Sequence, residues 1–263
     1  MNTKEVVDYI VNWLKNYAEN ANLEGFVIGI SGGIDSAVTS TLCAKTGLST
    51  LCIEMPIHQS KNQVSRAKEH IEQLKKRFPN VKHKCVELTP VFEEFKKQAS
   101  IPENDTFLDI TLANSRARLR MTTLFYFAGL YRYLVAGTGN KVEDFGVGFF
   151  TKYGDGGVDL SPIADLLKSE VYNVGYQVKV PDSILNAAPT DGLFGDNRTD
   201  EDQLGASYDE LEWAMKMKNI GKKIIDFKNR EKTVFEIYKR LNCVNQHKMI
   251  PIPICIIPSA LKK

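Results

Sequence analysis

The residues from Phe26 to Ser36 have the types and the spacing of a phosphate-binding site. Phe26–Ile30 is a short apolar run rich in β-branched residues, which is typical of a strand buried on both faces of a sheet. The glycines of Ser31–Gly33 allow a phosphate to approach backbone N–H groups closely. Asp35 adds a carboxylate, which suits a hard cation such as Mg²⁺ that bridges phosphate oxygens. This stretch therefore predicts a strand, a glycine turn and a helix start that bind phosphate groups together with a metal ion.

Two common phosphate-binding motifs do not fit this stretch. A Walker loop needs a Lys after its last glycine, and Ile34 follows Gly33 here. Gly29–Gly33 does not match the dinucleotide fingerprint Gly-x-Gly-x-x-Gly either. The pattern Ser-Gly-Gly-x-Asp-Ser instead resembles the pyrophosphate loop of the ATP-pyrophosphatase superfamily, which cleaves ATP between the α and β phosphates. A glycine turn without function remains the alternative, and the Asp-Ser pair inside the turn makes it the weaker one.

Strands and helices alternate on both sides of this loop. Apolar periodicity predicts helices at 3–20, 34–44, 62–78 and 89–98, and further strands at 49–54, 82–88 and 133–137. Such alternation predicts an α/β fold with a doubly wound parallel sheet flanked by helices, Rossmann-like in its layers. Ser161-Pro162 is expected to begin a helix that runs to about Val178. Asn186–Gly205 is loop-like and long, which suits an active-site lid.

A long helix is predicted over residues 108–131. Its second half, Met121–Tyr131, is apolar nearly all round, which is typical of a helix buried on more than one side. We expect this half either to cross the core or to pack against a second subunit. In the first half, Arg116, Arg118 and Arg120 lie two residues apart, about 200° around the helix. Arg118 therefore faces a different side from the other two, which favours a site role for it.

Composition excludes several classes of protein. The 263 residues are 43% hydrophobic with a net charge of +2, which allows a sizeable core and implies no general attraction to nucleic acid or membranes. The five cysteines are scattered, as in a cytoplasmic protein with reduced thiols. No run approaches the ~20 apolar residues of a membrane span. We find no clear domain boundary and expect one domain over residues 1–263.

Six motifs together resemble those of ammonia-dependent NAD synthetases, over nearly the whole chain. They are residues 29–36 (GISGGIDS), 114–121 (NSRARLRM), 136–143 (AGTGNKVE), 149–159 (FFTKYGDGGVD), 189–193 (PTDGL) and 247–248 (HK). The first motif identifies only the superfamily, and the last two are weak alone. Their order along one chain makes the resemblance specific.

The resemblance implies a ligase that forms a C–N bond. ATP would adenylate the nicotinate carboxylate of deamido-NAD (nicotinic acid adenine dinucleotide) and release pyrophosphate. Ammonia would then attack the acyl-adenylate and give NAD and AMP, the last step of NAD biosynthesis. A carboxylate is a poor electrophile and adenylation supplies a leaving group, so the protein's task is mainly positioning and charge stabilisation.

The resemblance also implies roles for particular residues. The ATP-binding set comprises Gly29, Ile30, Ser31, Gly32, Gly33, Ile34, Asp35, Ser36, Thr138, Lys168 and Thr190. The Mg²⁺ ligands would be Asp35 and Glu143, and the catalytic residues Asp35, Lys168 and Asp159. The deamido-NAD set comprises Arg118, Lys152, Asp159, His247 and Lys248, with Asp155 a lesser candidate. Without the resemblance, Glu143 and the His247-Lys248 pair would fit an ordinary protein surface as well as a site.

The resemblance also has implications for the assembly of the chain and for the loop after Glu143. These synthetases are homodimers with deamido-NAD at the subunit interface, which implies a homodimer here. We expect the spacing from Glu143 to Lys152 to differ by one residue from that of some relatives.

Two alternatives remain open at the level of sequence. One is another ATP pyrophosphatase, of the GMP-synthetase or tRNA-modifying type, although the near-neutral charge disfavours tRNA. The other is a non-catalytic nucleotide-binding or electron-transfer module on the same scaffold, which would not need Asp35, Glu143 and Lys168 together.

Overall fold

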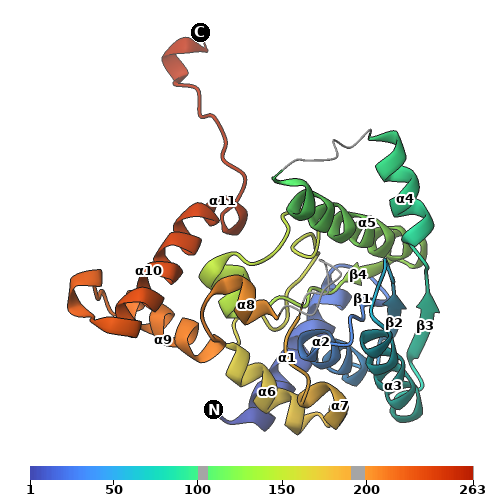
Figure 1. Cartoon of the computed structure of the whole chain (residues 1–263). Helices are drawn as coiled ribbons and strands as arrows, with labels where there is room; N and C mark the ends of the chain where they lie inside the picture. Colours follow the sequence, from blue (N-terminus) through green and yellow to red (C-terminus); the bar gives the residue numbers. More distant parts are fainter. Residues whose placement is uncertain (100–105, 191–198, 263) are drawn as a thin grey trace.

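A parallel β-sheet forms the centre of the molecule (Figure 1). The computed structural model describes residues 1–99, 106–190 and 199–262. In these residues the sheet has four strands in the order β3-β2-β1-β4. Their bounds are β1 Gly25–Gly29, β2 Ser49–Glu54, β3 Val81–Cys85 and β4 Tyr133–Val135. All pairings are parallel, which confirms the predicted α/β sheet.

The inner strand β1 leads into the predicted phosphate loop. Phe26, Val27 and Ile28 have no exposed surface, as expected of a strand covered on both faces. The edge strand β3 ends at Cys85 rather than at residue 88, because β2 stops before Pro56, which has no N–H to extend a ladder. Similarly, β4 ends at Val135 instead of residue 137.

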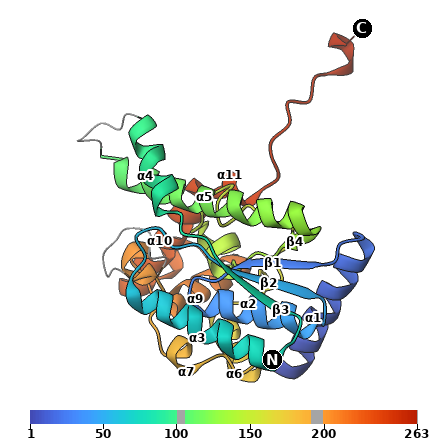
Figure 2. The ribbon, with the colours of Figure 1, turned by 90° about the vertical axis from the view of Figure 1, so that its right-hand side faces the viewer.

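Helices cover both faces of the sheet, so the fold is doubly wound (Figure 2). One face packs against α1 (Thr3–Asn20), α2 (Ile34–Lys45), α3 (Lys61–Arg77) and α6 (Lys168–Gln177). The other face packs against α4 (Thr89–Gln98) and α5 (Leu108–Tyr131). The α6 helix begins seven residues later than expected from Ser161-Pro162. Turns occupy that interval, and the Glu170 carboxylate accepts the Leu167 N–H at the true start.

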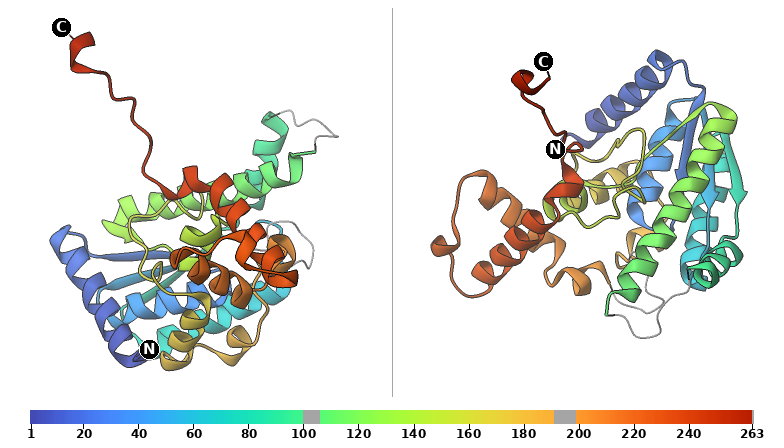
Figure 3. Two further views of the ribbon diagram at one scale, coloured as in Figure 1. Left: turned by 90° about the vertical axis from the view of Figure 1, so that its left-hand side faces the viewer. Right: turned by 90° about the horizontal axis from the view of Figure 1, so that it is seen from above.

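A third group of helices lies beside the sheet and has its own core (Figure 3). It consists of the π-helix η1 (Lys141–Val147), α8 (Asp200–Leu204), α9 (Tyr208–Asn219) and α10 (Asn229–Val244). Phe235 and Tyr238 are fully buried in this core. The remaining short helices are α7 (Asp182–Leu185), η2 (Ile224–Asp226), α11 (Gln246–Met249) and η3 (Ser259–Leu261). Much of the expected lid, residues 191–198, lies outside the described residues, and α8 forms part of the rest.

The apolar second half of α5 is not buried in the core of this chain. Of that half only Ala128 is buried, whereas Tyr126 and Leu130 keep 64% and 56% of their surface exposed. The expectation that this half crosses the core is therefore wrong. The helix lies against one face of the sheet and turns its other side outward (Figure 2). Packing against a second subunit stays a prediction.

Two further observations concern the chain as a whole. Of the helices that the structure describes, none combines the length and apolar character that a bilayer-spanning helix requires. All five cysteines are free thiols.

Candidate active site

The loop between β1 and α2 is held in shape by its own hydroxyl groups. The Ser36 hydroxyl donates to the Gly33 carbonyl at 3.0 Å and lies 3.3 Å from the Ser31 N–H that donates to it. Gly32 has φ +83°, and a Cβ at this position would lie 2.6 Å from the Gln63 carbonyl oxygen of α3. Only glycine fits both the backbone conformation and the close approach of α3. The loop leads directly into α2, whose first N–H groups and positive dipole end make this point favourable for an anion.

A cavity of about 280 Å³ opens at this point, over the carboxyl ends of the strands. Every residue predicted to bind ATP lines it: the run from Gly29 to Ser36, Thr138, Lys168 and Thr190. The predicted metal ligand Glu143 also lines it. Ligands of open α/β sheets bind at this edge. Folding thus brings together residues from three separate sequence motifs and Lys168.

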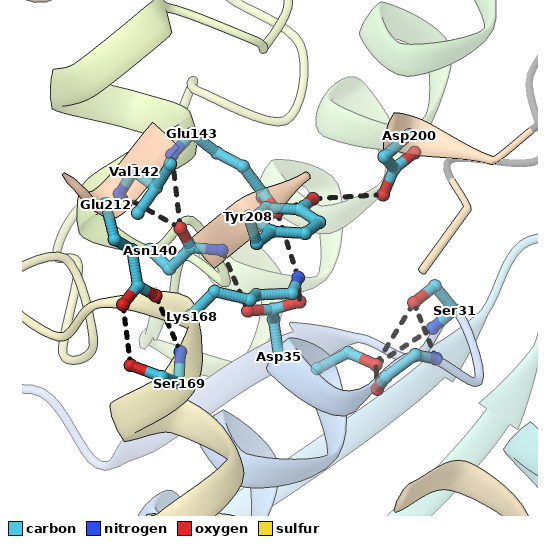
Figure 4. A network of polar contacts seen from close by, with 12 residues as sticks. Ser31, Asp35, Asn140, Val142, Glu143, Lys168, Ser169, Asp200, Tyr208 and Glu212 are labelled. Atoms are coloured by element: carbon cyan, nitrogen blue, oxygen red, sulfur yellow. Dashed lines mark hydrogen bonds and ion pairs between the residues drawn. The ribbon is translucent and has the colours of Figure 1, made fainter. Parts of the chain in front are cut away.

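A buried charge network forms one wall of the cavity (Figure 4). The Lys168 ammonium lies 2.6 Å from Asp35 Oδ2 and 2.9 Å from Glu143 Oε1. The Lys168 side chain is only 4% exposed, so water screens these contacts little. Asn140 donates its amide to Asp35 Oδ1 at 3.1 Å, and its own oxygen accepts the N–H groups of Val142 and Glu143. Asn140 therefore caps η1 and joins it to α2.

Electrostatics keeps this network ionised around Lys168. Burial alone would lower the pKa of Lys168, but the charges of Asp35 and Glu143 outweigh it and raise the pKa above its usual value. Burial also acts to raise the pKa of Glu143, and there Lys168 and the Tyr208 hydroxyl prevail and lower it. The pKa of Asp35 is raised by burial, against the attraction of Lys168. Two carboxylates thus share one ammonium.

The donors present fit a magnesium ion that is also bound by a nucleotide. Asp35 and Glu143 already hold a cationic group between them, which shows that the site accepts positive charge. Among the described residues, no three His, Cys, Asp or Glu side chains gather as a metal centre. Mg²⁺ typically takes one or two carboxylates and completes its shell with phosphate oxygens and water. Two carboxylates beside a phosphate loop match that requirement.

The residues predicted to bind deamido-NAD lie outside the lining of this cavity, and four of them gather together. Arg118 donates to the Lys152 carbonyl at 3.4 Å, and the Lys152 ammonium donates to the His247 carbonyl at 2.6 Å. Lys248 donates to two backbone carbonyls within residues 148–150. Asp159 is separate, because its carboxylate accepts the Val135 N–H of β4 at 2.8 Å. The structure therefore brings together four of the five residues and does not bring Asp159 to them.

The three arginines of α5 point in three directions. Arg116 stacks over the Phe92 ring at 4.5 Å, and Arg118 reaches Lys152. Arg120 lines the cavity and donates to the Met55 carbonyl at 3.0 Å. The helical angle correctly separated Arg118 from its neighbours, but it did not identify Arg120 as a cavity residue.

Sequence reasoning missed two more residues of the site, Asn140 and Tyr208, and gave a third, Asp155, only as a lesser candidate. Asn140 follows the strand-end glycine turn, and this position could have marked it. Asp155 lines the cavity and accepts the Thr151 N–H at 2.9 Å; burial raises the pKa of its carboxyl. Tyr208 touches Glu143 from 65 positions away, and no local pattern marks it.

The π-helix η1 carries Glu143 into the site. A π-helix is usually a turn of α-helix that holds one additional residue, and such turns occur mainly at functional sites. The expected one-residue difference in spacing between Glu143 and Lys152 would, if it is an extra residue in this chain, be accommodated by such a π-helical turn. The N-cap Asn140 keeps Glu143 directed at Lys168.

Known proteins resemble this chain over most of its length. The NH(3)-dependent NAD(+) synthetase of Mesoplasma florum is 42% identical over 216 residues, which are 81% of this chain and 84% of that protein. The protein of the same name from Carboxydothermus hydrogenoformans is 36% identical over 252 residues, 94% and 96% of the two chains. The structure of NMN synthetase from Francisella tularensis has a TM-score of 0.83 and 34% identity, and the match covers 98% of this chain and 99% of that one.

A model of the NAD synthase family matches residues 6–251. With this match and these relatives, the chain belongs to the NAD synthase family.

Proposed function

We propose that this enzyme amidates deamido-NAD to NAD with ammonia and ATP, through an acyl-adenylate, and releases AMP and pyrophosphate. The relatives from Mesoplasma florum and Carboxydothermus hydrogenoformans are NH(3)-dependent NAD(+) synthetases, which supports a ligase that forms a C–N bond in the last step of NAD biosynthesis. One observation of the structure carries the proposal. The whole predicted ATP-binding set lines a single cavity with Lys168, Asp35 and Glu143 in its wall.

The chain's own residues would bind and orient ATP. The N–H groups at the start of α2 would hold its phosphates. Asp35 and Glu143 would hold Mg²⁺, and Lys168 would donate to phosphate oxygens. When bound, Mg²⁺ would neutralise charge that develops on the departing pyrophosphate. The cavity would exclude water and keep the α-phosphate beside the nicotinate carboxylate.

The cationic group beside the cavity would bind the second substrate. Arg118, Lys152 and Lys248 bring positive charge to one region beside His247, and deamido-NAD carries a negative pyrophosphate bridge. We keep Asp159 in the proposed set with its catalytic role, although its carboxylate is bound to β4. Its contribution would require that the dinucleotide reach the end of this strand.

A second candidate substrate follows from the Francisella tularensis structure. That protein is an NMN synthetase, and it matches nearly the whole length of this chain. The alternative reaction is therefore amidation of nicotinic acid mononucleotide, which lacks the adenylate half of deamido-NAD. The same ATP cavity would serve either substrate.

An assay of pyrophosphate release separates these candidates. We expect release with ATP, Mg²⁺, ammonia and deamido-NAD, and much less with the mononucleotide or with glutamine in place of ammonia. A higher kcat/KM for the mononucleotide would reverse the choice of substrate. Pyrophosphate release that requires neither deamido-NAD nor nicotinic acid mononucleotide would indicate a different ATP pyrophosphatase.

The remaining proposals concern assembly and location. We propose that residues 1–263 act as one NAD synthetase domain in a cytoplasmic homodimer, without a nucleic-acid or membrane partner. The exposed apolar half of α5 supports the dimer, because soluble monomers seldom expose large apolar patches.

A further inference from the structure

Tyr208 connects two carboxylates at the inner end of the charge network (Figure 4). Its hydroxyl lies 2.5 Å from Glu143 Oε1 and 3.2 Å from Asp200 Oδ2. The side chain comes from the first turn of α9 and the residue is only 6% exposed. Because a hydroxyl has one hydrogen, the shorter contact shows that it is donated to Glu143. The ordinary ATP chemistry described above makes no use of this tyrosine.

Two donors meet one oxygen of the Glu143 carboxylate. The Lys168 ammonium and the Tyr208 hydroxyl both contact Oε1. The Asn140 amide also contributes a hydrogen bond to this carboxylate. Two donors on one oxygen fix the orientation of the carboxylate, which matters for a group that serves as a metal ligand.

Tyr208 is itself held in place against Lys168. Its ring lies under the Lys168 ammonium, with 4.7 Å between the nitrogen and the ring centroid. One turn further along α9, Glu212 accepts the N–H of Ser169 at 2.8 Å and its hydroxyl at 2.7 Å. Ser169 follows Lys168 directly, so this contact fixes α9 relative to α6.

We propose that Tyr208 is a positioning residue for the divalent-cation site, whose hydroxyl orients the Glu143 carboxylate. This inference rests on the proposed function, because it takes Glu143 as a ligand of Mg²⁺. With Lys168 turned towards phosphate oxygens, the Tyr208 hydroxyl would still hold the carboxylate in its orientation.

The competing explanation is that Tyr208 only fills the helical core, and the chain offers a control for it. Tyr238 belongs to the same core and is 1% exposed, with Lys218 over its ring at 5.8 Å. Its hydroxyl has no described contact with a carboxylate. Tyr208→Phe and Tyr238→Phe each remove one buried hydroxyl and keep the ring, so they differ in the contact with Glu143.

The test measures Mn²⁺ binding by electron paramagnetic resonance in the full-length protein with a non-cleavable ATP analogue. Loss of a hydrogen bond to a metal ligand typically weakens metal affinity about 10- to 100-fold. We expect a loss of this size in Tyr208→Phe and none in Tyr238→Phe. In kinetics, the KM for Mg²⁺ of Tyr208→Phe should rise more than its kcat falls, and high Mg²⁺ should restore turnover.

A double-mutant cycle with Glu143→Gln decides whether the hydroxyl acts through Glu143. Tyr208→Phe should weaken Mn²⁺ binding little further in the Glu143→Gln background. Equal losses in both backgrounds, or equal affinity of Tyr208→Phe and the wild type, would overturn the inference and leave the amidation reaction untouched. The inference would also be overturned if Tyr238→Phe lost as much Mn²⁺ affinity as Tyr208→Phe. Failure to amidate either acid would instead overturn the proposed function.

Discussion

At the scale of single residues, the site depends on buried charges that compensate one another. Lys168 neutralises part of the repulsion between Asp35 and Glu143 before any ligand arrives. Removing one partner of a buried ion pair leaves an uncompensated charge, which is much more costly than losing an exposed pair. The same residues should therefore govern both stability and cation binding.

Lys168→Met tests this coupling. Without metal, the variant should lose about 3 kcal/mol of unfolding free energy, because two carboxylates then face each other in a poorly solvated wall. Mg²⁺ with an ATP analogue should stabilise it more than it stabilises the wild type. Urea unfolding with and without ligand measures both effects.

Lys141→Met is the matched control, since Lys141 pairs with Asp165 at 2.7 Å where the Asp165 side chain is 96% exposed. It should change stability by less than about 1 kcal/mol. Equal stability losses for the two lysines would contradict the role given to Lys168.

His70 gives a prediction for pH. It is fully buried in α3, its Nε2 contacts the Ser40 hydroxyl at 2.8 Å, and burial lowers its pKa from 6.5 to about 4. In the unfolded chain His70 binds a proton near pH 6.5, whereas in the folded chain it binds one only near pH 4. Because protonation then favours the unfolded chain, the free energy of unfolding falls as the pH falls from 6.5 to about 4. The difference between 6.5 and about 4 corresponds to about 3 kcal/mol.

Urea unfolding between pH 7 and 4 checks this prediction by comparison with His70→Gln. The wild type should lose up to that amount more than the variant over the window, because carboxylates titrate alike in both proteins. Parallel stability curves would show that His70 does not control this part of the pH dependence.

At the scale of elements, the β1–α2 loop depends on close packing against α3. The Arg66 side chain of α3 donates to the Gly32 carbonyl at 3.1 Å, and the Gln63 carbonyl of the same helix lies close to the Gly32 Cα. The loop is therefore shaped both by its own hydroxyls and by a neighbouring helix. Its conformation should be sensitive to a single added methyl group.

Gly32→Ala and Gly47→Ala separate backbone strain from this close approach. Both glycines have a positive φ, +83° and +80°, so alanine should cost about 1–2 kcal/mol at either position. A Cβ at Gly47 meets nothing within 4 Å, whereas one at Gly32 lies 2.6 Å from the Gln63 carbonyl. Gly32→Ala should therefore lose more stability and also bind ATP more weakly.

Thermal unfolding and ATP titration measure these two effects. Gly47→Ala should keep the ATP affinity of the wild type, since it lies at the far end of α2. If both variants bind ATP equally well, the loop tolerates a displacement of α3, and the fit between Gly32 and Gln63 is not required.

At the scale of the whole molecule, two apolar surfaces lack a covering in one chain. The exposed face of α5 includes Phe125, Tyr126 and Leu130, and the segment after Met249 extends away from the body with its isoleucines exposed (Figure 1). Both surfaces border the region of Arg118, Lys152 and His247, because α5 and α11 supply two of these residues. A homodimer that buries them would link assembly to substrate binding.

Phe125→Asp tests this link. The variant should sediment as a monomer at concentrations at which the wild type is a dimer, because burying an unpaired charge in an apolar interface has a large free-energy cost. It should also lose deamido-NAD affinity while it keeps ATP affinity, as measured by calorimetry with each substrate.

Tyr9→Asp provides the control, since Tyr9 of α1 is 72% exposed and lies on a different helix. It should remain dimeric. A wild type that sediments as a monomer at micromolar concentration and still turns over would refute the proposed homodimer.

The sequence by itself determined the features that short-range patterns encode. The apolar run of β1, the glycines after it and the alternation of strands with helices predicted the parallel sheet and the nucleotide-binding edge, and the parallel sheet was confirmed. This succeeded because periodicity and backbone conformation depend on neighbouring residues. The resemblance named the ATP-binding set, and its members do line one cavity.

Only the tertiary structure decided which distant side chains meet. Lys168 reaches Asp35 across 133 positions and Tyr208 reaches Glu143 across 65, and no local pattern specifies such contacts. The apolar half of α5 could equally have been core or interface, because composition does not say which faces the chain itself can cover. The position of this helix in the packed fold excludes the core, and the packing of the other helices determines that Asn140 and Tyr208 belong to the site.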